Sequence, residues 1–225
     1  MTSSRFREYF MNRGGFLDCD GGTRLPEVES AMSGRGVVPH FFIQESCGGI
    51  ITKMIESGYE QVDRMAVMTP GATKLQAIRN LRVEVASGAG FKDWATGYLQ
   101  SFYGSLDLLP SVTAVLQPME ALRDATLLVG RVRSTVAGVL ALHRTPGLLG
   151  VYCVGTVPEF RGIGVAASML QAALEAGESE DRQVVLQTIL SDGYEPYYQR
   201  RGFNRLYLKA LLRKRIAISR GNGSG

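Results

Sequence analysis

The chain has 225 residues, of which 45% are hydrophobic and 20% are charged, and its formal net charge is +4 at pH 7. This composition suits a folded globular protein with one large core or two small ones, and it excludes a chain that is disordered throughout. The apolar stretches are far shorter than the roughly 18 residues that a membrane-spanning helix needs, and the first residues lack the apolar core of a signal peptide. We therefore expect a cytoplasmic protein with no membrane partner.

Cysteine and histidine are few and scattered. The three cysteines, Cys19, Cys47 and Cys153, are an odd number without C-x-x-C spacing, and the two histidines, His40 and His143, stand alone. We therefore expect neither a disulfide framework nor a metal site, and each of these residues should be a packing or surface residue.

The first predicted elements form a small α/β unit. "HFFIQ" (40–44) reads as a strand, "CGGIITKMIESG" (47–58) as a helix with apolar residues at helical spacing, and "VDRMAVMTP" (62–70) as a strand closed by proline. This stretch can be laid over residues 184–211, which places Gln44 on Gln187 and suggests an internal duplication.

The middle of the chain predicts a strand, two helices and a hairpin. The strand is "LRVEVAS" (81–87), the helices are "FKDWATGYLQSFYG" (91–104) and "PSVTAVLQPMEALRDA" (110–125, with a kink or restart at Pro118), and the hairpin covers residues 126–144.

The last third predicts a central apolar strand, "GLLGVYCVGTV" (147–157), a turn, a helix through about residue 176, and the strand "QVVLQTIL" (183–190). This order implies a parallel strand pair with a right-handed crossover. A short helix over "YEPYYQRRG" (194–202) and a basic hairpin follow. The basic residues alternate as in strands, so nucleic-acid binding is not expected.

The turn "TVPEFRGIGVAASML" (156–170) has the features of an anion site. A helix start offers unpaired N–H groups, Gly162 and Gly164 let a ligand approach, and Arg161 adds a guanidinium. An ordinary glycine-rich turn is the plain alternative. A dinucleotide fold is the first rival, because "GIGVAA" fits G-x-G-x-x-A. However, residues 158–161 separate the strand from the first glycine, and Asp192 lies about 30 residues on instead of ~20.

The same turn resembles the acyl-CoA turn of the GNAT N-acetyltransferase superfamily, whose signature is Arg or Gln, two residues, Gly, one residue, Gly or Ala. Arg161, Gly164 and Ala166 match it, and "YYQRRGF" matches the later Tyr-x-x-x-Gly-Phe element at Tyr198, Gly202 and Phe203. The element order from about residue 81 to residue 215 also resembles the family fold.

The resemblance implies an α/β GNAT fold, with a mixed central sheet flanked by helices, preceded by a smaller partial GNAT-like α/β unit. We expect residues 1–76 to form that partial and non-catalytic unit, because it lacks the arginine and spaced glycines. Residues 77–218 should form the catalytic GNAT domain, and residues 219–225 a flexible tail.

The resemblance also implies a site. In the family, a bulged strand holds the pantetheine arm and polarises the thioester carbonyl, and by motif position these backbone groups belong to Val154, Gly155 and Thr156. Gly155 is the residue expected at the bulge. The diphosphate would lie on the amides of the turn, with Arg161 beside it. These amides are those of Gly162, Ile163, Gly164, Val165 and Ala166.

Tyr198 is expected to protonate the leaving sulfur, with Tyr197 as the alternative. Ser191 stands where the family often has an asparagine near the coenzyme, so a weaker contact or a helix cap is expected there. The general base stays open between Tyr152 and a backbone-held water, and Glu159 is expected to be an exposed residue.

Cys153 has no His or Lys neighbour and is expected to be a buried thiol, not a nucleophile. The resemblance also implies that "SFYGSLDLLPSV" (101–112) faces the acyl end of the coenzyme, so the amine acceptor is expected there, where Asp107 could attract a cation.

The expected function is an acyl-CoA-dependent N-acyltransferase that moves acetyl from acetyl-CoA to a primary amine by direct attack in a ternary complex. A non-catalytic acyl-CoA binding or sensing module is the alternative from another class, and a dinucleotide-binding protein is the second. The sequence specifies neither the amine, which is a small molecule or a protein amine, nor an oligomeric state.

Overall fold

The computed structural model describes residues 14–15, 19, 25–72, 75 and 78–215, so the expected tail at 219–225 lies outside the described residues. The chain divides into two compact units. The smaller unit contains residues 1–67, 188–195 and 205–225, and the larger unit contains residues 68–187 and 196–204. The expected domain boundary at residue 76 stays a prediction.

The smaller unit has the strand order β1-β2-β9-β3. β1 pairs with β2 in parallel and β2 pairs with β9 antiparallel. The strands are β1 (Gly14–Gly15), β2 (His40–Gln44), β3 (Tyr59–Pro70) and β9 (Phe203–Lys214), and the helices are α1 (Leu25–Ser33) and α2 (Gly48–Glu56). The expected strand, helix and strand at 40–70 are therefore confirmed.

Both helices of the smaller unit pack on one face of β2. Phe41 and Ile43 share a buried cluster with Met32 of α1 and Met54 of α2, whereas Phe42 points to a second cluster with Leu211. β2 is therefore covered on both faces, which explains why its three central residues are all apolar.

The larger unit has the strand order β8-β7-β6-β5-β4, with antiparallel pairs except for the parallel pair of β7 and β8. The expected mixed sheet and the expected parallel pair are confirmed. The strands are β4 (Leu81–Val85), β5 (Ala125–Val132), β6 (Thr135–Thr145), β7 (Leu148–Thr156) and β8 (Gln183–Ile189).

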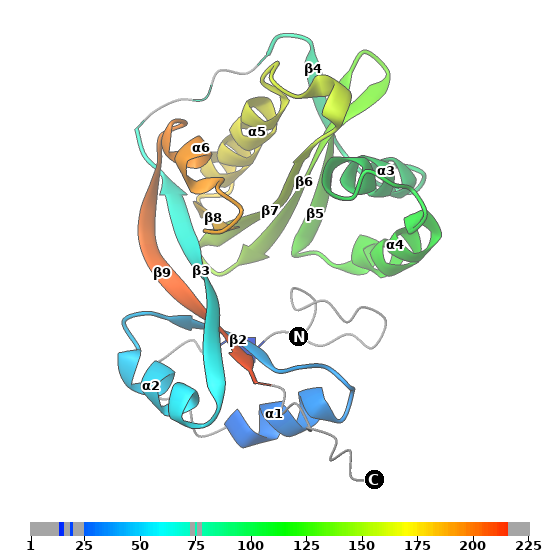
Figure 1. Ribbon diagram of the computed structural model, residues 1–225. Coiled ribbons are helices and arrows are strands. Elements are labelled where there is room, and N and C mark those ends of the chain that lie inside the picture. Colours follow the sequence, from blue (N-terminus) through cyan, green and yellow to red (C-terminus); the bar gives the residue numbers. More distant parts are fainter. Residues whose placement is uncertain (1–13, 16–18, 20–24, 73–74, 76–77, 216–225) are drawn as a thin grey trace. The chain divides into compact units, whose positions relative to one another are not determined.

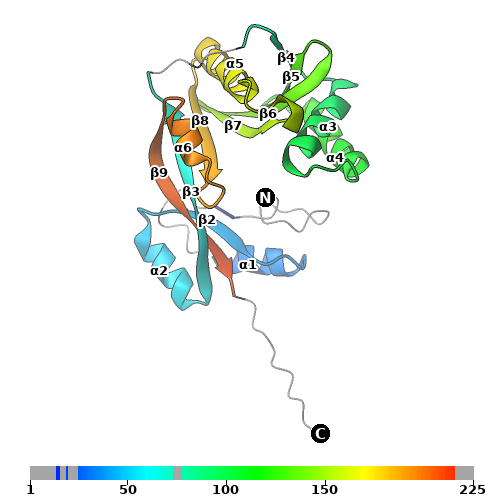
Figure 2. The ribbon, with the colours of Figure 1, turned by 45° about the horizontal axis from the view of Figure 1, so that its top comes forward.

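Helices cover both faces of this sheet, with α3 and α4 on one face and α5 on the other (Figures 1 and 2). The helical elements are α3 (Gly90–Phe102), α4 (Leu109–Leu116), the 3-10 turns at Gln117–Ala121 and Pro158–Phe160, α5 (Val165–Ser179) and α6 (Glu195–Gln199). The expected restart at Pro118 is confirmed as the end of α4 and the start of a 3-10 turn. Within the described ranges, no helix has both the length and the apolar character that crossing a membrane requires.

The sheet core under α3 is built by residues at helical spacing. Phe91, Trp94 and Ala95 of α3 are buried against Leu127 and Val129 of β5, as expected for one apolar stripe of an amphipathic helix. This stripe fixes α3 on the sheet and thereby sets where its last turn lies.

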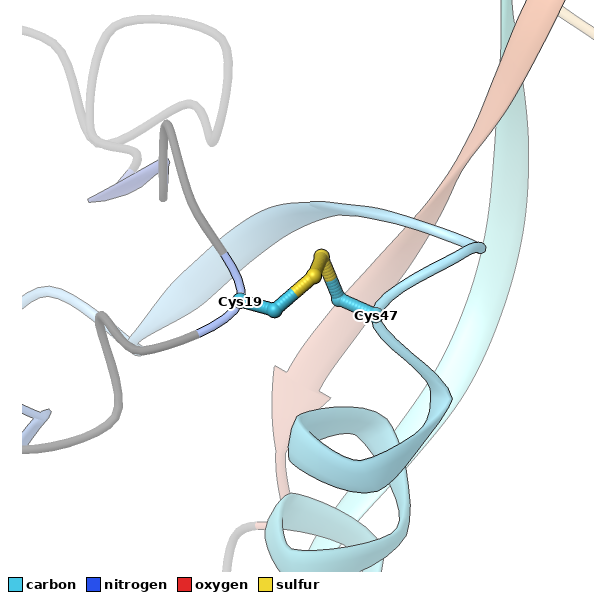
Figure 3. The surroundings of a disulfide bond; sticks show 2 residues. All are labelled: Cys19 and Cys47. Carbon is cyan, nitrogen blue, oxygen red and sulfur yellow. A yellow bond between two sulfur atoms is a disulfide. The ribbon is translucent and has the colours of Figure 1, made fainter.

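Two sequence expectations are wrong. The basic C-terminal stretch is one long strand, β9, and not a hairpin. Cys19 and Cys47 form a disulfide, with their Cα atoms 5.0 Å apart, whereas no disulfide was expected. Figure 3 shows this bond joining the segment at Cys19 to the residue that precedes α2. The two cysteines are 28 residues apart, and only the folded chain brings them together.

Candidate functional site

Strand β7 carries a bulge near its carboxyl end. Tyr152 pairs with Ala141 of β6 and Gly155 pairs with Val139, so Cys153 and Val154 together face the single residue Leu140. Cys153 has a φ of 52°, in the left-handed region that a side chain rarely adopts. The expected bulge is therefore present, but it is centred on Cys153 and Val154 and not on Gly155.

β7 leaves its parallel neighbour just before this bulge. Its pairing with β8 covers Leu148 to Val151, opposite Gln183 to Leu186, while β7 itself continues to Thr156. Among the described residues, β7 has no β8 partner beyond Val151. A strand that ends its pairing in this way exposes N–H and C=O groups that a ligand backbone can use.

Close packing against α3 explains why residue 155 is a glycine. A Cβ at this position would lie 2.8 Å from Ser101 Cβ and 2.9 Å from Phe102 Cε2. The last turn of α3 therefore rests directly on β7, beside the bulge. One turn earlier, a Cβ on Gly97 would lie 2.7 Å from a methyl group of Val139, so the small residues at 97 and 101 form the contact face of α3.

A hydrogen bond from Trp94 also holds α3 in place opposite the bulge. Its indole Nε1 donates a 3.0 Å hydrogen bond to the carbonyl of Leu140, the residue that faces the two bulge residues. Because Trp94 is buried, this bond satisfies a carbonyl that water cannot reach.

Arg161 links the end of β7 to α3. Its Nε donates to Thr156 O at 3.3 Å, and one of its terminal nitrogens donates to Ser101 O at 3.0 Å. Ser101 Oγ, in contrast, is buried and finds no hydrogen-bond partner among the described residues. The guanidinium is exposed, so it holds these carbonyls and still faces solvent.

The start of α5 is rich in unpaired donors. Within the described part of the chain, the N–H groups of Gly162 to Ala167 have no acceptor, and the first that has one is Ser168 N, which donates to Gly164 O at 3.0 Å. Gly162 and Gly164 have φ values of 82° and 100°, a conformation that requires glycine.

α5 is held in place by close packing. A Cβ on Gly138 of β6 would lie 2.6 Å from a methyl group of Val165, the first residue of α5. The helix start is therefore fixed against the sheet, and its donors need no rearrangement to receive an anion. Gly162 and Gly164 leave room for a ligand here, and the free amides and Arg161 can donate hydrogen bonds to it. These groups fit a diphosphate.

Tyr197 and Tyr198 lie on α6 in different surroundings. Arg201 covers the ring face of Tyr197 at 3.5 Å, and burial raises the pKa of this phenol. Tyr198 is half-buried, with its ring edge-on to Phe203 at 6.0 Å between centroids. Residues 196–204 belong to the same compact unit as the turn and β7.

The remaining predicted residues are placed as follows. Ser191 belongs to the smaller unit, where its hydroxyl donates to the carboxylate of Asp63. Burial raises the pKa of the Cys153 thiol to about 11, so this group is protonated at neutral pH. Glu159 is exposed and Tyr152 is half-buried.

Sequence reasoning missed the part that α3 plays in this site. The signal was present in "WATGYLQSF" (94–102), where Gly97 and Ser101 are one turn apart on the face that also carries Trp94. Small residues at this spacing allow a helix to approach a neighbour closely.

Within the described residues, no group of three or more His, Cys, Asp or Glu side chains could hold a metal ion.

These features agree with the comparison with known domain families. Residues 110–214 match the model of the acetyltransferase (GNAT) domain. Residues 110–214 form a GNAT domain. This GNAT region contains the bulged strand β7, the turn at Arg161 and helix α6.

Solved structures support the same fold for most of the chain. A conserved protein of unknown function from Staphylococcus epidermidis is 18% identical, with a TM-score of 0.65 over 93% of this chain and 87% of that one. An N-acetyltransferase from Kribbella flavida is also 18% identical, with a TM-score of 0.66 over 89% of this chain and 77% of that one.

A tandem GNAT protein from the clavulanic acid pathway is 10% identical, with a TM-score of 0.61 over 86% of this chain and 68% of that one. No curated protein matches this sequence.

Proposed function

We propose that the protein is an acyl-CoA-dependent N-acyltransferase that transfers acetyl from acetyl-CoA to a primary amine. The observation that carries the proposal is the run of unpaired N–H groups from Gly162 to Ala167, directly after a bulged strand that has left its parallel neighbour. The GNAT domain match supports a general acyltransferase role.

In this proposal, the coenzyme lies along β7 and the turn. The backbone of Val154, Gly155 and Thr156 binds the pantetheine arm and polarises the thioester carbonyl. The amides of Gly162 to Ala166 and the free donors of Arg161 bind the diphosphate.

The amine nitrogen attacks the thioester carbonyl carbon, and the carbon–sulfur bond breaks. Tyr198 donates a proton to the departing sulfur, and the amine loses one proton to Tyr152 or to a water held by the backbone. Cys153 takes no part, because its buried thiol stays protonated at neutral pH and forms no acyl-enzyme.

The first experiment is calorimetric titration of the full chain with acetyl-CoA, CoA and NAD in one buffer, followed by an assay of thiol release with primary amines. Acetyl-CoA binding with thiol release supports the enzyme. Binding without release from any amine favours the acyl-CoA sensing module, and binding of NAD in place of acetyl-CoA contradicts the proposal.

A matched pair of variants tests the turn. Gly162 and Gly147 both have positive φ, at 82° and 73°, both are exposed, and a Cβ at either position meets nothing within 4 Å. Gly162→Glu places a carboxylate among the proposed diphosphate donors and should weaken acetyl-CoA binding about 100-fold. Gly147→Glu carries the same backbone strain and charge and should bind like the parent chain. Equal binding by both variants would remove the turn from the site.

Tyr198→Phe tests the proton donor. The ring keeps its packing on Phe203, so the dissociation constant for acetyl-CoA should stay unchanged while kcat falls about 100-fold. An equal loss in binding and rate would assign Tyr198 a packing role instead.

A further inference from the structure

The last residue of α3 and the connection to α4, together Phe102 to Leu108, carry four exposed large apolar side chains. The exposed fractions are 49% for Phe102, 46% for Tyr103, 42% for Leu106 and 46% for Leu108. Four large apolar side chains within seven residues form a patch, and such a patch marks a binding surface more often than scattered single residues do.

The aromatic part of this patch is held rigidly. The rings of Phe102 and Tyr103 both pack on Tyr98, at 5.1 and 5.8 Å between centroids, and Tyr98 stacks on the buried Trp94 at 5.2 Å. Rings fixed in this way lose little conformational entropy when a ligand covers them.

The patch also reaches the proposed acyl site. The Phe102 ring edge lies 2.9 Å from the place of a Cβ on Gly155, the β7 residue beside the bulge. An acceptor that covers the exposed side of this ring therefore has a short path to the thioester that β7 is proposed to hold.

Charged residues are rare in the sequence around the patch, and the Arg161 guanidinium bonds to the carbonyl of Ser101, next to Phe102. From Thr96 to Leu116, Asp107 is the only charged residue. Its backbone N–H donates to Ser105 Oγ, and its carboxylate has no partner among the described residues. One exposed carboxylate can pair with one ammonium, whereas a polycation would leave its other charges beside apolar side chains.

We propose that the acceptor is a small amine with a single ammonium group on an aryl or alkyl body. Its apolar body docks on Phe102, Tyr103, Leu106 and Leu108, and Asp107 attracts its ammonium before the nitrogen is deprotonated. The proposal rests on the proposed N-acyltransferase function and specifies the substrate class of that site.

The test compares kcat/KM for 2-phenylethylamine, hexylamine, spermidine and a lysine-rich peptide, each with saturating acetyl-CoA. The two apolar amines should exceed spermidine and the peptide by at least about tenfold. A preference for spermidine or the peptide would overturn the proposal.

Two substitutions in the patch and one control substitution test whether the patch contacts the acceptor. Leu106→Ser and Leu108→Ser should each raise KM for 2-phenylethylamine about threefold to tenfold, with an unchanged dissociation constant for acetyl-CoA. Leu122→Ser removes a leucine that is 55% exposed elsewhere in the same unit and should change neither value. Equal kinetics in all three variants would overturn the proposal, because the patch would then not touch the acceptor.

The remaining outcomes are also decisive. Light scattering that shows a dimer, together with a monomeric Leu108→Ser variant of unchanged KM, would make the patch a subunit contact and overturn the proposal. Acetyl-CoA binding with thiol release from other primary amines, but from none of these four, would overturn it as well. Failure of acetyl-CoA to bind would instead refute the proposed function itself, and the titration that precedes the kinetics separates these two failures.

Discussion

Substitution of Gly155 by alanine tests the contact between α3 and β7. The added Cβ would lie 2.8 Å from Ser101 Cβ, and carbon atoms in contact settle at about 3.5 to 4.0 Å, so the last turn of α3 must move by about 0.7 Å or more. Such overpacking costs about 1–3 kcal/mol, and the reduced freedom of the unfolded chain returns about 0.4–1 kcal/mol. We expect a net loss of about 1 kcal/mol.

Thermal unfolding measures this loss, because about 1 kcal/mol lowers Tm by about 2–4 °C in a chain of this size. Gly90→Ala is the control. It lies at the other end of α3, where a Cβ makes an ordinary 3.7 Å contact with Ala86, and its Tm should be equal or slightly higher. Ser101→Gly should restore part of the stability of Gly155→Ala by removing the clashing Cβ. Equal Tm values for Gly155→Ala and the parent chain, or strict additivity in the double variant, would refute the contact as the cause.

Three further outcomes are expected. Cys153→Ala should retain turnover with acetyl-CoA, and because burial disfavours the thiolate and raises its pKa to about 11, alkylation of Cys153 in the native protein should stay slow at pH 8 and accelerate as the pH approaches 11. Loss of the Trp94 hydrogen bond in Trp94→Phe should lower the free energy of unfolding in urea by about 0.5–1.5 kcal/mol, since one hydrogen bond to the buried Leu140 carbonyl is lost. Peptide mapping without reductant should find Cys19 linked to Cys47, and reduction should lower the stability by about 3–4 kcal/mol, as expected for a separation of 28 residues.

The sequence predicted most elements because local patterns determine them. The alternation in "LRVEVAS", the helical spacing from Phe91 to Trp94 and the proline at 118 each act within one turn or strand, and β4, α3 and the end of α4 follow these signals. The basic stretch of β9 was predicted as a hairpin, whereas the structure has one extended strand that pairs with β2. The disulfide depends on a contact between residues 28 positions apart, and no local sequence pattern indicates such a contact.

The site could be predicted only in part, for a related reason. Arg161, Gly162 and Gly164 lie within four residues, so their spacing is visible in the sequence, and the positive φ values at both glycines agree with it. The bulge was misplaced because β7 is apolar on both faces, and a strand without polar alternation gives no sign of where its register shifts. The contact of Ser101 with Gly155 joins residues 54 positions apart, and it is set by the packing of α3.

Arg161 has enough hydrogen-bond donors to bind α3 and the proposed diphosphate at the same time. A guanidinium carries five N–H donors. The carbonyls of Thr156 and Ser101 take one each, and three remain for other acceptors. The same side chain can therefore keep α3 joined to the end of β7 while it binds an anion, and it need not break its bonds to the two carbonyls to do so. A lysine ammonium has only three donors on one nitrogen and no fixed fork, so it could not serve all of these acceptors from one position.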